Sequence, residues 1–111
     1  MTATDLEFPG FTWADAYNAQ LLDHSEGRTT NNGPAMRSIY RIADDTVKIE
    51  VERDTYTFQS HAAAYVLAAD RTWTHLLSED SASWHRSSHT HEELIPVRDR
   101  LGERAATVLG A

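Results

Sequence analysis

Apolar and polar residues alternate between Arg37 and Leu77, and this alternation constrains the fold more than any other feature of the chain. Successive side chains of a β-strand point to opposite faces, so a strand with one buried face shows a period of two. Turns at Asp44-Asp45 and Arg53-Asp54 would keep the apolar residues of three consecutive strands on one face. The cross-strand pairs that follow are Ile42 with Val47, Tyr40 with Ile49, Ser38 with Val51, Arg37 with Glu52, Val51 with Tyr56, Ile49 with Phe58 and Lys48 with Gln59. The pattern predicts an antiparallel meander.

The alternation continues beyond the second turn and predicts two further features. A long third strand begins at Thr55, and its inner face carries Ser60, Ala62, Ala64 and Val66. After a turn at Asp70-Arg71, a fourth strand runs from Thr72 to Leu77, with Trp73, His75 and Leu77 facing inward. A helix over residues 60–77 is the alternative, because several apolar residues of this segment also recur at helical spacing. The succession of Thr72, Trp73 and Thr74, all poor helix formers, favours strands.

A helix is predicted on each side of the meander. Thr12 is a suitable N-cap, with Asp15 three residues later, and an apolar residue recurs every four positions from Trp13 through Tyr17 to Leu21. This helix is expected to end near His24, and residues 25–34 are expected to form an exposed loop. The C-terminal helix begins around Pro96 and ends at Gly110. Its predicted buried stripe consists of Val97, Leu101, Ala105 and Val108.

These elements predict one α+β domain over residues 1–111. Its architecture is a two-layer sandwich with an N-terminal helix, a four-stranded antiparallel meander and a C-terminal helix. If residues 60–77 are helical instead, the domain has three strands and three helices.

Composition argues against several classes of partner. The net charge is −7 with only ten Lys and Arg residues, so a nucleic-acid partner is not expected. No apolar run approaches the ~20 residues of a membrane span, and the N-terminus lacks the pattern of a signal peptide. A cytoplasmic protein without a membrane partner is therefore expected. Cysteine is absent, which excludes disulfides and thiolate metal sites.

The predicted inner face contains a candidate ligand pocket. Ser60, Ala62 and Ala64 are small, so they would leave a hollow beside His75. A hollow with an aromatic rim and one titratable group is typical of a small-molecule site. Its predicted lining consists of Tyr40, Tyr56, Phe58, Trp73 and His75. The competing interpretation is that a helix packs closely over the alanines and fills the space.

A second candidate site is a cluster of histidines near the C-terminal helix. His85, His89 and His91 precede Glu92 and Glu93, and neutral imidazoles together with carboxylates suit zinc, nickel or iron. The competing interpretation is a polar loop that contains histidines. No second-shell partner for these ligands can be identified, so tight transition-metal binding is not expected.

No motif indicates catalysis or a cofactor. The serines lack a Gly-x-Ser-x-Gly elbow, and neither Gly27 nor Gly33 belongs to a phosphate-binding loop. The sequence therefore favours a small acidic protein-interaction module that is not an enzyme and needs no cofactor. A homodimer is expected, because the strand from Arg37 to Ala43 would be an uncovered sheet edge. The alternatives are a small-molecule-binding or enzymatic domain that uses the pocket, and a metal site at the histidines.

Overall fold

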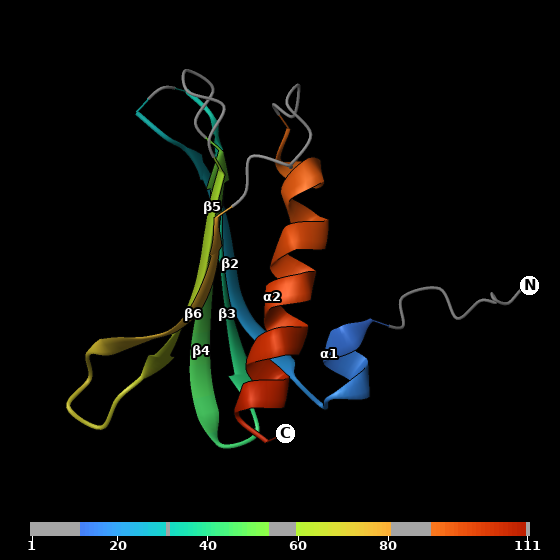
Figure 1. The fold of residues 1–111 in the computed structure, drawn as a ribbon, viewed down its shortest axis with the longest axis vertical. Coiled ribbons are helices and arrows are strands. Elements are labelled where there is room, and N and C mark those ends of the chain that lie inside the picture. Colours follow the sequence, from blue (N-terminus) through green and yellow to red (C-terminus); the bar gives the residue numbers. More distant parts are fainter. Residues whose placement is uncertain (1–11, 31, 54–59, 81–89, 111) are drawn as a thin grey trace, which may run out of the picture.

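The computed structural model describes residues 12–30, 32–53, 60–80 and 90–110, without the side chain of Asp80. Five strands form one antiparallel sheet in the order β2-β3-β4-β5-β6, and Figure 1 shows helix α2 lying along one face of it. We call this covered face the inner face and the opposite one the outer face. The elements are α1 (Trp13–Ala16), β2 (Gln20–Arg28), β3 (Pro34–Ile42), β4 (Asp45–Arg53), β5 (Ser60–Leu67), β6 (Trp73–Asp80), the 3-10 helix η1 (His91–Leu94) and α2 (Ile95–Val108).

The sheet confirms the antiparallel meander, but the first hairpin differs from the prediction in register. The turn consists of Ala43 and Asp44, and Ala43 has a positive φ of 56°. Tyr40 therefore lies opposite Val47 and Ser38 opposite Ile49, which is a shift of two residues from the predicted pairs. A shift by an even number leaves every side chain on its predicted face. The alternation of the sequence therefore cannot detect it.

The β4–β5 and β5–β6 hairpins confirm strands, and exclude a helix, for the two segments 60–67 and 73–80. Strand β5 is described from Ser60 to Leu67, and the predicted strand start at Thr55 lies outside the described residues. Val51 lies opposite Ala62 and Ile49 opposite Ala64. Ser60, Ala62 and Ala64 are buried on the inner face as predicted. The predicted pairs of Val51 with Tyr56, Ile49 with Phe58 and Lys48 with Gln59 are therefore wrong, although Tyr56, Phe58 and Gln59 themselves lie outside the described residues. The predicted turn at Arg53-Asp54 is wrong as well, because Arg53 belongs to β4 and lies opposite Ser60.

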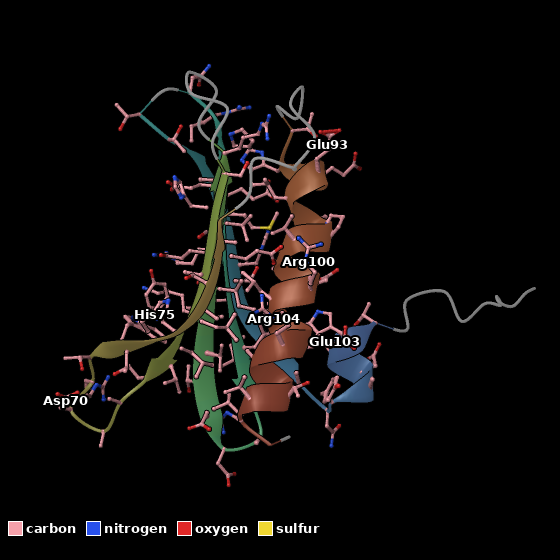
Figure 2. The ribbon with its side chains drawn as sticks, in the orientation of Figure 1. Asp70, His75, Glu93, Arg100, Glu103 and Arg104 are labelled. Atoms are coloured by element: carbon pink, nitrogen blue, oxygen red, sulfur yellow. The ribbon has the colours of Figure 1, made fainter. Side chains whose placement is uncertain are left out.

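A β-bulge in β6 makes the predicted orientation of Trp73 and His75 wrong. Leu77 lies opposite Ala64, whereas His75 lies opposite Tyr65, so Leu76 is an additional residue between them. Leu77 keeps its inward orientation, but the additional residue reverses the alternation before it. Figure 2 shows His75 on the side of the sheet away from α2. Trp73 lies opposite Leu67, which belongs to the same outer face.

The N-terminal segment differs most from its predicted structure. The Asp15 carboxylate accepts a hydrogen bond from the Thr12 backbone N–H at 2.8 Å, as expected of a capping residue. The helix nevertheless ends at Ala16, and Asn18 follows with a φ of 59°. Residues 20–28 then form β2 and pair with β3. The fifth strand was therefore missed, and β3 is an interior strand, not the predicted sheet edge.

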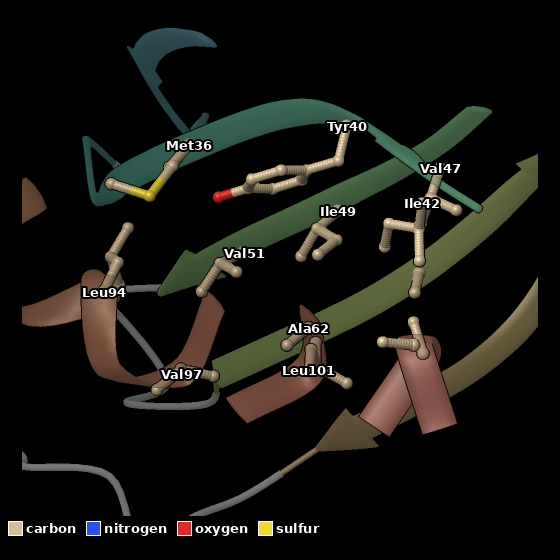
Figure 3. Close-up of a cluster of buried hydrophobic side chains, with 13 residues drawn as sticks. Met36, Tyr40, Ile42, Val47, Ile49, Val51, Ala62, Leu94, Val97 and Leu101 are labelled. Carbon is tan, nitrogen blue, oxygen red and sulfur yellow. The ribbon is translucent and has the colours of Figure 1, made fainter. Parts of the chain in front are cut away.

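The core lies between the inner face and α2. Figure 3 shows Ile49, Val51 and Ala62 of the sheet close to Leu101 of the helix. Three members of the predicted helical stripe (Val97, Leu101 and Ala105) are buried, but Val108 is 61% exposed. Gly110 follows α2 with a φ of 76°, in agreement with its predicted role at the helix end. Among the residues that the structure describes, neither helix combines the length and apolar character needed to cross a bilayer.

Helix α1 is attached to α2 by Trp13. The indole Nε1 donates a hydrogen bond to the Asp99 carboxylate at 3.1 Å, and the ring contacts Tyr40 edge to face at a centroid distance of 5.0 Å. Gly102 makes this packing possible, because a Cβ at that position would lie 2.2 Å from Cζ2 of Trp13.

We expect Gly102→Ala to lower the stability of the protein, because the Trp13 ring must move away from α2. In a Trp13→Ala background the sign should reverse, since alanine is a better helix residue than glycine by roughly 0.5–1 kcal/mol. Urea denaturation of the four proteins measures both effects. The same sign in both backgrounds would contradict the proposed contact.

Candidate binding surfaces

The outer face of the sheet is hollowed over β4, β5 and β6. The hollow has a volume of about 370 Å³, and we call it the outer groove. Its lining residues are Glu50, Glu52, His61, Ala62, Ala63, Tyr65, His75 and Ser78. The register explains the depression, because the small Ala63 lies between Glu50 of β4 and Ser78 of β6. Figure 1 shows the β5–β6 hairpin bending away from α2 on this side.

Charged and aromatic side chains meet at one end of the outer groove. Lys48 Nζ lies 3.6 Å from the Glu50 carboxylate. The same ammonium lies 5.0 Å from the ring centroid of Tyr65 and 4.8 Å from that of Trp73. The Tyr65 ring in turn contacts His75 edge to face, at 5.8 Å between centroids. This part of the surface therefore binds an ammonium group through a carboxylate and two aromatic rings.

The structure does not bring together the described members of the predicted pocket. Tyr40 is buried on the inner face, whereas Trp73 and His75 lie on the outer face. Tyr56 and Phe58 lie outside the described residues. The alternative prediction was that a helix packs closely over the alanines. The structure agrees with it, because α2 packs over Ala62 and Ala64 on the inner face.

A chain of polar contacts connects β2 with the helices on the inner side. His24 Nδ1 lies 2.8 Å from Ser38 Oγ, and His24 Nε2 lies 3.0 Å from the Glu26 carboxylate. Arg98 of α2 donates to Ser38 Oγ at 3.4 Å and to Asp99 at 3.1 Å. A hydroxyl, an imidazole and a carboxylate in this order are the components of a nucleophilic triad. Ser38 is 0% exposed, however, so its hydroxyl has no access to a substrate.

Two groups in this region have shifted pKa values. The hydrogen bond from His24 lowers the pKa of Glu26, and nearby His91 and Arg98 act in the same direction. Burial raises the pKa of the Tyr40 phenol, with the negative charge of Asp99 as a smaller cause of the same sign. The lowered pKa favours the ionised carboxylate of Glu26 and the raised pKa favours the neutral phenol of Tyr40, which are the usual forms of these groups near neutral pH. The region therefore acts as a structural connection between β2 and α2.

Of the three histidines predicted to bind a metal, only His91 lies within the described residues. Its Nε2 lies 2.7 Å from the Gly27 carbonyl oxygen, to which it donates a hydrogen bond. Its Nδ1 lies 3.8 Å from the Glu26 carboxylate. Within residues 12–30, 32–53, 60–80 and 90–110, no group of three or more potential ligands could hold a metal ion. A site that also uses His85 and His89 stays a prediction.

Arg53 is a fully buried cation on the inner face, with an exposed fraction of 0%. Its Nη1 donates to Ser60 Oγ at 3.0 Å, but Nε and Nη2 find no acceptor among the described residues. A buried charge is costly without full pairing, so this position contributes less to stability than its burial suggests.

No family model, no curated protein and no solved structure matches this chain. The class that its geometry defines is a small α+β domain with one helix-covered face and one open face. The outer groove was missed by sequence reasoning, although the alternation already places Glu50 and Glu52 on the solvated face. His75 could not be added to them, because the bulge at Leu76 has no recognisable sequence pattern.

Proposed function

We propose that this chain is a small acidic protein-interaction module that binds rather than catalyses, and that it self-associates as a homodimer through β2. The proposal is based on the exposure of β2 at the edge of the sheet. All nine residues of β2 are exposed, and its only described sheet neighbour is β3. An uncovered strand presents unpaired backbone groups that can pair with another chain.

The exposed apolar residues favour β2 over the opposite edge. Leu21 is 50% exposed and Leu22 is 44% exposed, and among the described residues only Val108 is a further exposed large hydrophobic residue. Strand β6 ends in Ser78-Glu79-Asp80, and its Glu79 is held by Arg100 of α2 at 2.7 Å. Antiparallel pairing of two β2 strands would bury the leucines and form one closed, twofold-symmetric dimer.

A binding role agrees better with the inner-face chemistry than an enzymatic one. The Ser38 hydroxyl lies next to an imidazole, but it is sealed below the surface. A nucleophile must reach the reacting atom of its substrate, so this arrangement supports structure, not acyl transfer.

Light scattering across a dilution series tests the dimer. We expect a mass of twice 12.5 kDa at micromolar protein, and a shift towards the monomer for Leu22→Asp, because the introduced carboxylate would be buried between two strands. Val108→Asp is the control, since it replaces another exposed large apolar residue, which lies on α2 and not on β2.

A mass of 12.5 kDa at every concentration would contradict self-association. Equal effects of the two aspartate variants would show that β2 is not the interface.

A second candidate function is ligand binding on the open face. It is favoured by the outer groove, which has the volume of a small-molecule site and brings His75 next to Tyr65. The ligand would differ from the one expected of an inner pocket, because the walls are charged.

A further inference from the structure

We propose that the outer groove binds the ammonium group of a lysine side chain from a partner protein. This inference extends the interaction function to a second surface and does not depend on the dimer. The groove and β2 occupy different parts of the molecule, since β3 and β4 separate β2 from β5. Each can therefore fail without the other.

The charge of the lining favours a cation. The described lining residues include the carboxylates of Glu50 and Glu52 and the imidazoles of His61 and His75, but neither lysine nor arginine. Both glutamates project from the same face of β4, two residues apart, so a single ammonium group can approach both. The nearest cation across the sheet is Arg37, which lies opposite Glu50 on the β3 side, away from β5. The net charge of −7 adds a general attraction for basic partners.

The chain's own Lys48 shows which cation the surface accepts. Its ammonium group is held by Glu50 at 3.6 Å and by the faces of Tyr65 and Trp73. Two of these three partners, Glu50 and Tyr65, also line the outer groove. A second ammonium group inside the outer groove would contact the carboxylate of Glu50 and the ring of Tyr65, and it would also contact the carboxylate of Glu52.

The shape of the groove suits a lysine side chain. Ala63 lines it with a methyl group that can contact the methylenes of the lysine stem, whereas the side chain of Ala62 is buried on the inner face. The volume of about 370 Å³ is close to the lower limit of typical ligand pockets and is sufficient for one lysine side chain.

The test is an NMR titration of the isotope-labelled full chain with the blocked peptide Gly-Gly-Lys-Gly-Gly. We expect saturable shifts of the backbone amides of residues 48–52, 61–65 and 75–78. The same peptide with an acetylated lysine should cause none, because acetylation keeps the stem and removes the charge. Equal shifts with both peptides, or no saturation at millimolar peptide, would overturn the proposal.

Two double variants distinguish specific binding in the outer groove from general attraction to a negatively charged protein. Glu50→Gln with Glu52→Gln should weaken binding about tenfold or more, since each loses a charge-assisted contact. Glu92→Gln with Glu93→Gln removes the same net charge from η1, whose Glu93 lies by the N-terminal end of α2 in Figure 2. This control should bind as the unaltered chain does, and equal weakening by the two pairs would overturn the proposal.

The variant Lys48→Met should change the affinity for the lysine peptide in the opposite direction. Removal of the internal ammonium group leaves Glu50 and Tyr65 without their present partner, so the peptide should bind more tightly. Weaker binding would show that Lys48 supports the groove and does not compete for it, which contradicts the proposal. Light scattering of the same variants should give the same mass as the unaltered chain, so that loss of peptide binding is distinguished from a change of oligomeric state.

Discussion

Replacement of Ile49 by alanine is expected to lower the free energy of unfolding by about 2–5 kcal/mol. Ile49 is completely buried at the centre of the sheet, between Ser38 of β3 and Ala64 of β5. The substitution removes three carbon atoms and leaves a cavity, because the strands on both sides prevent collapse of the space. Equilibrium denaturation in urea gives the difference directly.

Glu50→Ala is the matched control, since the next residue of the same strand points to the outer face. Its partner Lys48 lies 3.6 Å away in a partly exposed ion pair, so the cost should be well below 1 kcal/mol. Similar losses for the two variants would mean that the faces of β4 are assigned incorrectly.

Replacement of Gly33 by alanine is expected to destabilise the protein by roughly 1–3 kcal/mol through overpacking. A Cβ at this position would lie 1.7 Å from the backbone oxygen of Arg53 and 2.9 Å from its carbonyl carbon. The obstacle is main chain, which cannot turn aside as a side chain can. The β2–β3 turn must therefore separate from the end of β4.

Gly27→Ala provides the comparison, because Gly27 belongs to the same hairpin and a Cβ there would meet nothing within 4 Å. We expect its effect to stay within about 0.5 kcal/mol. Thermal denaturation of the two variants side by side is sufficient. A harmless Gly33→Ala would show that the approach of Arg53 to this turn is less close than described.

The parts of the fold that were predictable are those with a strong internal period. The faces of β3 and β4 and the buried stripe of α2 follow from the alternation and from helical spacing. The register of the β3–β4 hairpin was not predictable to better than two residues, because the turn at Ala43-Asp44 and one at Asp44-Asp45 produce the same faces. No local preference in the sequence selects the observed turn, because it places the non-glycine residue Ala43 at a positive φ.

The features that sequence reasoning missed depend on contacts distant in the chain. Strand β2 is exposed along its whole length and mostly polar, so it depends on backbone pairing with β3 and has no amphipathic period of its own. Trp13, Tyr17 and Leu21 have helical spacing, but the turn at Asn18 separates them into a helix and a strand. The candidate groove could be predicted only in part, since Glu50 and Glu52 follow the alternation of β4 and His75 does not.

Because of the bulge at Leu76, the geometry of the outer face depends on the number of residues in β6. A regular strand places every second residue on one face, but β6 presents both His75 and Ser78 to the groove, three positions apart. Among related chains, substitutions could alter the chemistry of this surface gradually. Loss of one codon at position 76 would instead straighten the hairpin and flatten the groove while every lining residue remained in place. Alignment gaps at this position would therefore mark a change in what the surface binds.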